Sequence, residues 1–211
     1  MNEVYTAICG GYDREWAVPV ERRLILDTPE TAQYLEGHGS IGGSRLAAKF
    51  WKTHPHVACP DAEVTVWLDG NMVPNRPSFL DDLVRELGDD DLLLFRHPWR
   101  DDIYEEAAVS RTGQKYDGQP LEAQVAAYRE QGHPEHWGLM HAAVIVRRNT
   151  PAMRALDDAL WAETLRWTLQ DQIALAYLLR GWGGRWHWHP DSIFEHVTRR
   201  DHVGPDVWRA A

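Results

Sequence analysis

The chain has 211 residues, with 32 acidic and 22 basic side chains and a formal net charge of −10. This length suits one hydrophobic core and no Ser-, Gly- or Pro-rich linker divides it, so we predict a single domain over residues 1–211. The acidic balance disfavours nucleic-acid binding. Because no apolar run is long enough to span a membrane, no secretory leader precedes the first strand, and Cys9 and Cys59 lie far apart, we expect a cytoplasmic protein.

The first part of the chain alternates between apolar runs and turn residues. Residues 3–9 predict a strand, which Gly10-Gly11-Tyr12-Asp13 interrupts with residues that allow the backbone to approach a ligand such as a nucleotide base. Residues 22–26 predict a second strand. The polar stretch over residues 27–43 is interpreted as a mobile connection that can fold over a ligand.

A basic face is expected on the next helix, residues 44–53. Arg45, Lys49 and Lys52 are spaced at i, i+4 and i+7, which places three cations along one side of a helix. Such a face can simply be solvated. Because neighbouring elements of α/β folds usually pack together, the cations can instead face a cleft beside the strand that ends at Asp69. That position would suit a diphosphate.

The apolar residues 64–68 predict a buried strand that ends in Asp69-Gly70-Asn71. Asp69 offers an anionic oxygen and Asn71 a neutral one, and Gly70 permits the sharp turn that lets both face one side. One carboxylate and one amide suit a divalent cation whose remaining ligands come from a diphosphate. Asp-Gly and Gly-Asn are also ordinary turn pairs, so this tripeptide alone leaves both interpretations open.

The middle of the chain places many ionisable side chains after another strand. Residues 77–87 predict a helix and residues 91–95 a buried strand. The polar residues that follow, over 97–106, fit either the rim of a cleft or the acidic start of a helix.

The C-terminal half predicts three helices, one strand and a histidine-rich end. Helices are expected over 119–131, from Thr150-Pro151 onward, and over 171–180, with a strand over 138–147. The apolar residues expected on the buried side of the helix that begins at Thr150 are Met153, Leu156, Leu160 and Leu165. The late histidines His187, His189, His196 and His202 are either solvent-facing or able to complete a metal site.

Taken in chain order, these signals resemble a nucleotide-sugar glycosyltransferase of the GT-A type. The matching residues are Val4-Tyr5-Thr6, Tyr12-Asp13, Arg45 with Lys49, Trp67-Leu68-Asp69-Gly70-Asn71, His97-Pro98 with Arg100, Tyr104-Glu105-Glu106, Gly138-Leu139, Asp171-Gln172 and the late His202-Val203-Gly204-Pro205. The chain is most similar to the glycosyltransferase-like domains, formerly of unknown function, found in plant pollen-turgor and seed-mucilage proteins and in bacteria. The resemblance covers nearly the whole chain and implies one GT-A-like, Rossmann-like α/β domain with a mostly parallel central sheet flanked by helices.

A more distant similarity to the glycogenin-like transferases implies a metal site. By that similarity Asp69, Asn71 and His202 would bind Mn²⁺ or Mg²⁺, while Asp171 and Gln172 would lie near the donor sugar. Two features depart from the pattern. Asn71 stands where that family has a second acid, and no lysine follows His202, so Arg199 or Arg200 is a candidate for the missing cation.

The expected activity is glycosyl transfer from a nucleoside diphosphate sugar, uridine-linked, to a carbohydrate, glycoside or small-molecule acceptor. Asp171 would either orient the sugar or act as a base, and the sequence leaves the stereochemical outcome open. The predicted site residues are Asp171 and Gln172 for catalysis, Thr6, Tyr12, Asp13, Arg45, Lys49, Asp69, Gly138 and Leu139 for the donor, and His97, Arg100 and Glu105 for the acceptor or cleft rim.

Two other classes of function compete with this one. In the first, Asn71 has weakened catalysis and the chain is a binding module for a nucleotide or sugar. In the second, His187 and His189 join Asp69 in a metal-dependent hydrolase, although two strand histidines among tryptophans are the simpler interpretation. Sugars can also stack on tryptophan. The candidates for such a groove are Trp16, Trp99, Trp137 and Trp182.

Overall fold

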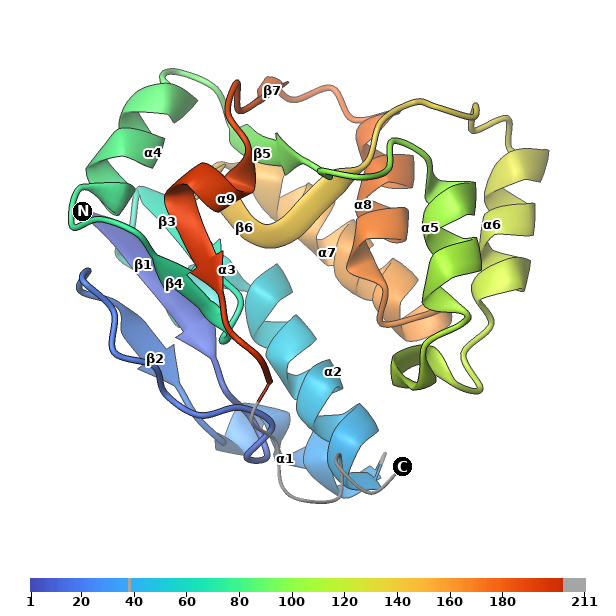
Figure 1. Ribbon diagram of the computed structural model, residues 1–211, viewed down its shortest axis with the longest axis horizontal. Helices are drawn as coiled ribbons and strands as arrows, with labels where there is room; N and C mark the ends of the chain where they lie inside the picture. The colour runs from blue at the N-terminus through green and yellow to red at the C-terminus, as the bar shows by residue number, and fades with distance from the viewer. Residues whose placement is uncertain (38, 203–211) are drawn as a thin grey trace.

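The computed structural model describes residues 1–37 and 39–202, and its centre is a six-stranded sheet (Figure 1). The strands, in the spatial order β2-β1-β3-β6-β5-β7, are Arg23–Ile25, Asn2–Ala7, Val64–Leu68, Met140–Arg148, Leu92–Arg96 and Trp186–Trp188. β1 is parallel to β2 and β3, β5 is parallel to β7, and β6 is antiparallel to both β3 and β5. Five strands therefore share one direction, and the predicted α/β class with a mostly parallel sheet is confirmed.

Helices cover both faces of this sheet, which explains why its central strands β3, β5 and β6 carry apolar runs. The helices are α1 (Pro29–Gly37), α2 (Gly39–Thr53), α3 (Pro55–Ala58), α4 (Phe79–Leu87), α5 (Ile103–Ser110), η1 (Gln114–Tyr116), α6 (Leu121–Glu130), α7 (Pro151–Arg166), α8 (Asp171–Leu179) and α9 (Ile193–His196). A small second sheet pairs β4 (Met72–Pro74) with β8 (Val197–Arg199). Among the described helices, none is both long and apolar enough to cross a bilayer.

The alternation of side chains along β3 separates two apolar cores. Trp67 packs with residues of α2, α7 and α8 on one face of the sheet. Val66 and Leu68 pack with residues of α4 and α9 on the other face. Figure 1 shows α2, α7 and α8 grouped together, with α4 and α9 lying apart from them. The strand that ends at Asp69 is thus held on both sides, which fixes the direction in which its last residues leave the sheet.

Two expectations from the sequence are wrong. The polar stretch over residues 27–43 is largely helical instead of an irregular connection, because α1 and the start of α2 occupy it. α1 forms because Tyr34 and Leu35 pack against the core and Thr31 is fully buried, so tertiary contacts outweigh the polar composition. Leu165 is 55% exposed and does not extend the buried face of α7.

Close contact between α1 and α2 gives a stability prediction at Gly43. A Cβ at this position would lie 2.4 Å from the Tyr34 carbonyl oxygen and 3.1 Å from the Leu35 Cα, so the two helices would have to separate. We expect Gly43→Ala to lower the free energy of unfolding by about 1–3 kcal/mol in urea titrations, as overpacking does elsewhere. Gly181→Ala is the control, because its Cβ would meet no atom within 4 Å. Equal stability of the two variants would contradict this packing.

Candidate functional site

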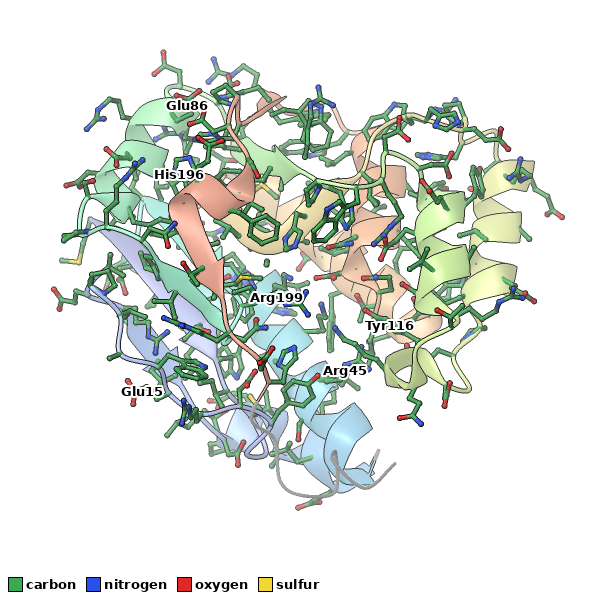
Figure 2. All side chains as sticks on the ribbon, viewed as in Figure 1. Glu15, Arg45, Glu86, Tyr116, His196 and Arg199 are labelled. Atoms are coloured by element: carbon green, nitrogen blue, oxygen red, sulfur yellow. The ribbon has the colours of Figure 1, made fainter. Side chains whose placement is uncertain are left out.

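A cavity of about 320 Å³ lies at the edge of the sheet where the parallel strands β1, β3 and β5 end. The segments following these three strands line it, as expected for ligand sites in open α/β sheets. The other walls come from α2, α5, η1, the start of α8 and the segment after β8. In Figure 2, Arg45 on α2 and Tyr116 in η1 lie beside one another, and the Arg45 guanidinium lies 4.8 Å from the centre of the Tyr116 ring.

The cavity concentrates positive charge in a chain whose formal net charge is −10. Six Lys or Arg side chains and four Asp or Glu side chains line it. They are Arg45, Lys49, Lys52, Arg100, Lys115 and Arg199, and Asp13, Asp69, Glu106 and Asp171. All three lysines of the sequence are in the first set. Such a local excess of cations favours an anionic ligand.

Two of these lysines join the carboxylates that end β3 and begin α8. Lys52 Nζ lies 2.7 Å from Asp171 Oδ2 and 3.3 Å from Asp69 Oδ1. Lys49 Nζ lies 2.7 Å from the same Asp171 oxygen. Trp67 Nε1 donates a hydrogen bond of 2.6 Å to Asp69 Oδ1. The basic face of α2 therefore faces the cavity, which is one of the two alternatives left open by the sequence.

The contacts among Lys49, Lys52 and Asp171 shift the pKa values of these side chains. Burial by itself would raise the pKa of Asp171, but Lys49 and Lys52 outweigh burial and hold that pKa well below its usual range. Burial lowers the pKa of Lys49 to about 8, against the opposing effect of Asp171. Asp171 is consequently ionised and a poor proton acceptor at neutral pH.

A second cluster brings a late histidine to the first loop of the chain. His202 Nδ1 lies 2.8 Å from Asp13 Oδ2, and its Nε2 lies 3.4 Å from Asn71 Nδ2. Asn71 Nδ2 also donates to the Arg200 carbonyl oxygen at 3.0 Å. The carboxylate of Asp13 favours the proton on Nδ1 and leaves a lone pair on Nε2. A carboxylate behind the imidazole is the usual arrangement around a metal-binding histidine.

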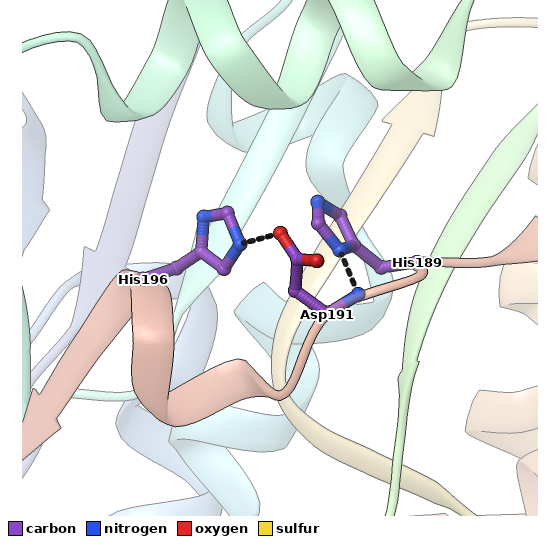
Figure 3. A group of neighbouring side chains, drawn as sticks. All are labelled: His189, Asp191 and His196. Atoms are coloured by element: carbon purple, nitrogen blue, oxygen red, sulfur yellow. Dashed lines mark hydrogen bonds and ion pairs between the residues drawn. The ribbon is translucent and has the colours of Figure 1, made fainter.

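His189, Asp191 and His196 form another group, with one possible ligand atom from each lying within 4.8 Å of the others (Figure 3). His189 Nδ1 accepts a hydrogen bond of 3.0 Å from the Asp191 backbone N–H. His196 Nδ1 faces the guanidinium of Arg76 at 3.4 Å, and its Nε2 faces Asp191 Oδ2 at 3.3 Å. Both Nδ1 atoms face donors, so the protons belong on Nε2, the reverse of His202. Hydrogen bonds to neighbouring protein groups therefore explain this cluster of side chains better than a bound metal ion does.

The rim after β5 is built around the buried carboxylate of Glu106. It accepts hydrogen bonds from Arg100 Nε at 2.5 Å, Gln170 Nε2 at 2.6 Å and Ser110 Oγ at 3.1 Å. His97 lies beside it, with Nδ1 accepting from the Arg100 backbone N–H at 3.1 Å. Burial, assisted by Arg100, lowers the pKa of His97 to about 4, so this imidazole is neutral at pH 7. Residues 97–106 form both a cleft rim and a helix start, the two alternatives left open by the sequence. His97 and Arg100 line the cavity, and Asp102 caps α5.

Most of the predicted site residues line the cavity. They are Tyr12, Asp13, Arg45, Lys49, Asp69, Asn71, His97, Arg100, Asp171, Gln172 and His202. Four residues do not: Thr6, Glu105, Gly138 and Leu139.

Each of these four has a structural reason for lying elsewhere. Thr6 is fully buried within β1, and the cavity begins one residue later. Leu139 belongs to the apolar core, and Gly138, with φ of +121°, packs against the Trp188 ring. Glu105 is exposed on α5, because a helix turns about 100° per residue and presents the next residue, Glu106, to the cavity.

Several residues that line the cavity are missing from the predicted site residues, although the sequence contained evidence for some of them. Lys52 already belonged to the basic face predicted on the helix, and Lys115 is marked by being the remaining one of only three lysines. Of the two arginines considered near the end of the chain, Arg199 lines the cavity, while the Arg200 guanidinium lies 5.8 Å from the Trp16 ring. Val203, Gly204 and Pro205 lie outside the described residues.

The arrangement expected for a hydrolase is not formed. His187 Nδ1 pairs with Asp90 Oδ2 at 2.8 Å, and His189 stacks on Phe95. Neither histidine lines the cavity that contains Asp69.

Two solved structures are similar to this chain over part of their length. The WbbM bifunctional glycosyltransferase is 14% identical, with a TM-score of 0.46, over 80% of this chain and 28% of that one. Mouse xyloside xylosyltransferase 1 is 14% identical, with a TM-score of 0.44, over 80% of this chain and 63% of that one. The chain thus spans less than two thirds of either protein. No curated protein matches it in sequence.

Residues 42–204 match the model of a family described as the TOD1/MUCI70 glycosyltransferase-like domain. This range is well over half of the chain and contains the basic face of α2, the Asp69 turn and the start of α8. The match confirms the resemblance to glycosyltransferase-like domains that was drawn from the sequence. The chain belongs to the TOD1/MUCI70 glycosyltransferase-like domain family.

Proposed function

We propose that the cavity binds a nucleoside diphosphate sugar, uridine-linked, and transfers its sugar to an acceptor hydroxyl. The observation that carries this proposal is the gathering of all three lysines of an acidic chain in one cavity at the ends of parallel strands. Under this proposal residues 1–211 form one GT-A-type unit acting in the cytoplasm.

The diphosphate would lie against the basic face of α2. Arg45 lines the cavity and is 6% exposed; its Nη1 donates to the Lys115 carbonyl oxygen, and its Nη2 is buried without a hydrogen-bond partner among the described residues. A guanidinium can bind two phosphate oxygens at once, while Lys49 and Lys52 act as point charges. Together they would stabilise the negative charge that grows on the leaving diphosphate. Tyr12 and Asp13, which follow β1 and line the cavity, would contact the base and ribose.

The donor set beside Asp69 fits a divalent cation such as Mn²⁺ or Mg²⁺. Asp69 and His202 would hold it, and the orientation of His202 by Asp13 supports this choice. Asn71 directs its Nδ2, not its amide oxygen, toward His202 Nε2, so it would join them as a ligand only with its amide turned over. When bound, such a cation would neutralise charge on the diphosphate. The Asp69 carboxylate already pairs with Lys52, and the Asn71 side chain carries no charge. We therefore expect the cation to bind weakly until the diphosphate supplies further oxygens.

Asp171 would orient the donor sugar and would not act as a base. Its carboxylate is ionised and held by two ammonium groups, which suits accepting a sugar hydroxyl but disfavours taking its proton. Gln172 adjoins it, with Oε1 accepting from the Ala142 backbone N–H at 3.3 Å. Asn71 favours one other possibility, a binding module that retains this site without turnover.

A thermal-shift titration with uridine diphosphate and MnCl₂, separately and together, tests the donor site. We expect the two ligands to raise the melting temperature cooperatively, because each helps to hold the other in one site. Asp69→Ala should abolish that cooperativity, and Asp69→Asn, which keeps an acceptor for Trp67 Nε1, should show the same loss with less destabilisation.

Asp61→Ala is the matched control, since this exposed carboxylate lies away from the cavity. It should retain the full shift. The absence of any shift at millimolar ligand would refute the donor site. A full cooperative shift without turnover, across a panel of uridine diphosphate sugars, would identify the binding module instead.

A further inference from the structure

One tryptophan differs from the others that the structure describes. Trp99 is 63% exposed and lines the cavity. Trp67 also lines the cavity but is only 3% exposed. The other candidates for a sugar groove are partly buried and do not line the cavity. They are Trp16, Trp137 and Trp182.

Trp99 begins a row of rings that leads into the cavity, which we call the aromatic rim: Trp99, His97, His141 and Phe194. The Trp99 ring lies 5.6 Å from His97 and 5.8 Å from Phe194. His141 stacks on His97 at 5.7 Å and lies 5.8 Å from Phe194. Its imidazole lines the cavity; its Nδ1 is buried, and its Nε2 forms no hydrogen bond with the described residues. The aromatic rim therefore combines an apolar ring surface with an imidazole nitrogen that has no hydrogen-bond partner in the described part of the chain.

This combination matches the two kinds of surface on a sugar ring. A pyranose has an apolar face of C–H groups, which packs on an indole ring, and hydroxyls at its edge, which need polar partners. A membrane or an apolar protein surface would require a contiguous apolar patch. The other exposed large apolar residues of the described chain do not line the cavity. They are Met1, Leu26, Val57, Val109 and Leu165.

We propose that the acceptor is a carbohydrate, that Trp99 stacks on one of its rings, and that His141 binds a hydroxyl of the same saccharide. This inference rests on the function proposed above, because the rim leads into the cavity assigned to the donor. It replaces the three acceptor classes left open by the sequence with one.

The test uses an array of neutral, acidic and amino-sugar oligosaccharides, probed with the full-length protein in the presence of uridine diphosphate and MnCl₂. For an oligosaccharide that binds, we expect Trp99→Ala to weaken the affinity about tenfold, because the aromatic contact with the sugar is lost. Trp99→Phe should retain most of the affinity, because it keeps an aromatic ring. His141→Ala should also weaken binding. Leu165→Ala, which removes an exposed apolar side chain outside the cavity, should leave it unchanged.

The thermal shift with uridine diphosphate is measured on every variant, which separates the two proposals. A normal shift with no oligosaccharide bound, or with binding unchanged in Trp99→Ala, would overturn the carbohydrate acceptor while the donor site stands. Trp99-dependent binding to phosphatidylcholine vesicles, with no oligosaccharide bound, would assign Trp99 to a membrane and also overturn it. Trp99-dependent oligosaccharide binding without any nucleotide shift would support the rim and refute the donor site.

Discussion

Lys52→Met is expected to lower the free energy of unfolding by about 3 kcal/mol and to abolish stabilisation by uridine diphosphate. Lys52 is 2% exposed and connects the carboxylates of Asp171 and Asp69. Breaking a buried ion pair costs about 3–5 kcal/mol. The lower end applies because Lys49 still pairs with Asp171 and because the Asp69 side chain is 38% exposed. Urea denaturation, followed by thermal-shift titration of the folded variant, would measure both effects.

Lys115→Met provides the matched control for Lys52→Met. Lys115 lines the same cavity, but it is exposed and has no ion-pair partner among the described residues. Its replacement should change stability by less than about 0.5 kcal/mol. It should still weaken nucleotide binding. If both lysine variants lose stability equally, or if Lys52→Met binds the nucleotide normally, Lys52 does not hold the cluster together as described.

Arg147→Met is expected to destabilise the protein by about 3–5 kcal/mol, because it leaves a buried carboxylate without its partner. Arg147 Nε lies 3.1 Å from Asp157 Oδ1, and neither side chain is more than 2% exposed. Arg147 Nη1 also donates to the Lys52 carbonyl oxygen at 2.9 Å. The pair therefore connects β6 and α7 to the end of α2, the helix that carries the cavity lysines. The double variant Arg147→Met/Asp157→Leu should recover most of the loss.

The loss in Arg147→Met should grow with pH. Burial raises the pKa of Asp157 to about 7, against the opposing effect of Arg147. A carboxyl group whose pKa is higher in the folded state makes stability fall as the pH rises from its unfolded pKa to its folded pKa. Removing Arg147 raises the folded pKa further, so the deficit should be larger at pH 8 than at pH 5. A deficit independent of pH, or no recovery in the double variant, would show that Asp157 is not the cause.

Local sequence was sufficient for the elements whose signals lie within a few residues. The apolar run ending in Asp69-Gly70-Asn71 gave β3 and its turn, and the i, i+4, i+7 spacing gave the basic face of α2. Thr150 accepts from the Met153 backbone N–H at 3.2 Å, as an N-cap before a proline should. These features depend on periodicity, on turn chemistry and on which side chains can reach their own backbone.

The sequence failed where a neighbour distant in the chain decides the outcome. α1 is polar, yet it folds because α2 offers a surface for Tyr34 and Leu35. Glu106 faces the cavity in place of Glu105 because the exact starting residue of α5 sets the direction of each side chain. A difference of one residue in the start of a helix rotates its face by about 100°, and local patterns do not define helix ends that closely.

The sequence by itself determined the α/β class, the basic helix, the acid-bearing turn and the family, because periodicity and motif order are properties of the linear chain. Only the tertiary structure decided that Lys52 connects Asp69 to Asp171, that His202 reaches Asp13, and that Trp99 is the exposed tryptophan of the cavity. These contacts follow from the sheet order and from helix packing. They join residues far apart in sequence, whose separation fixes neither their distance in space nor their exposure.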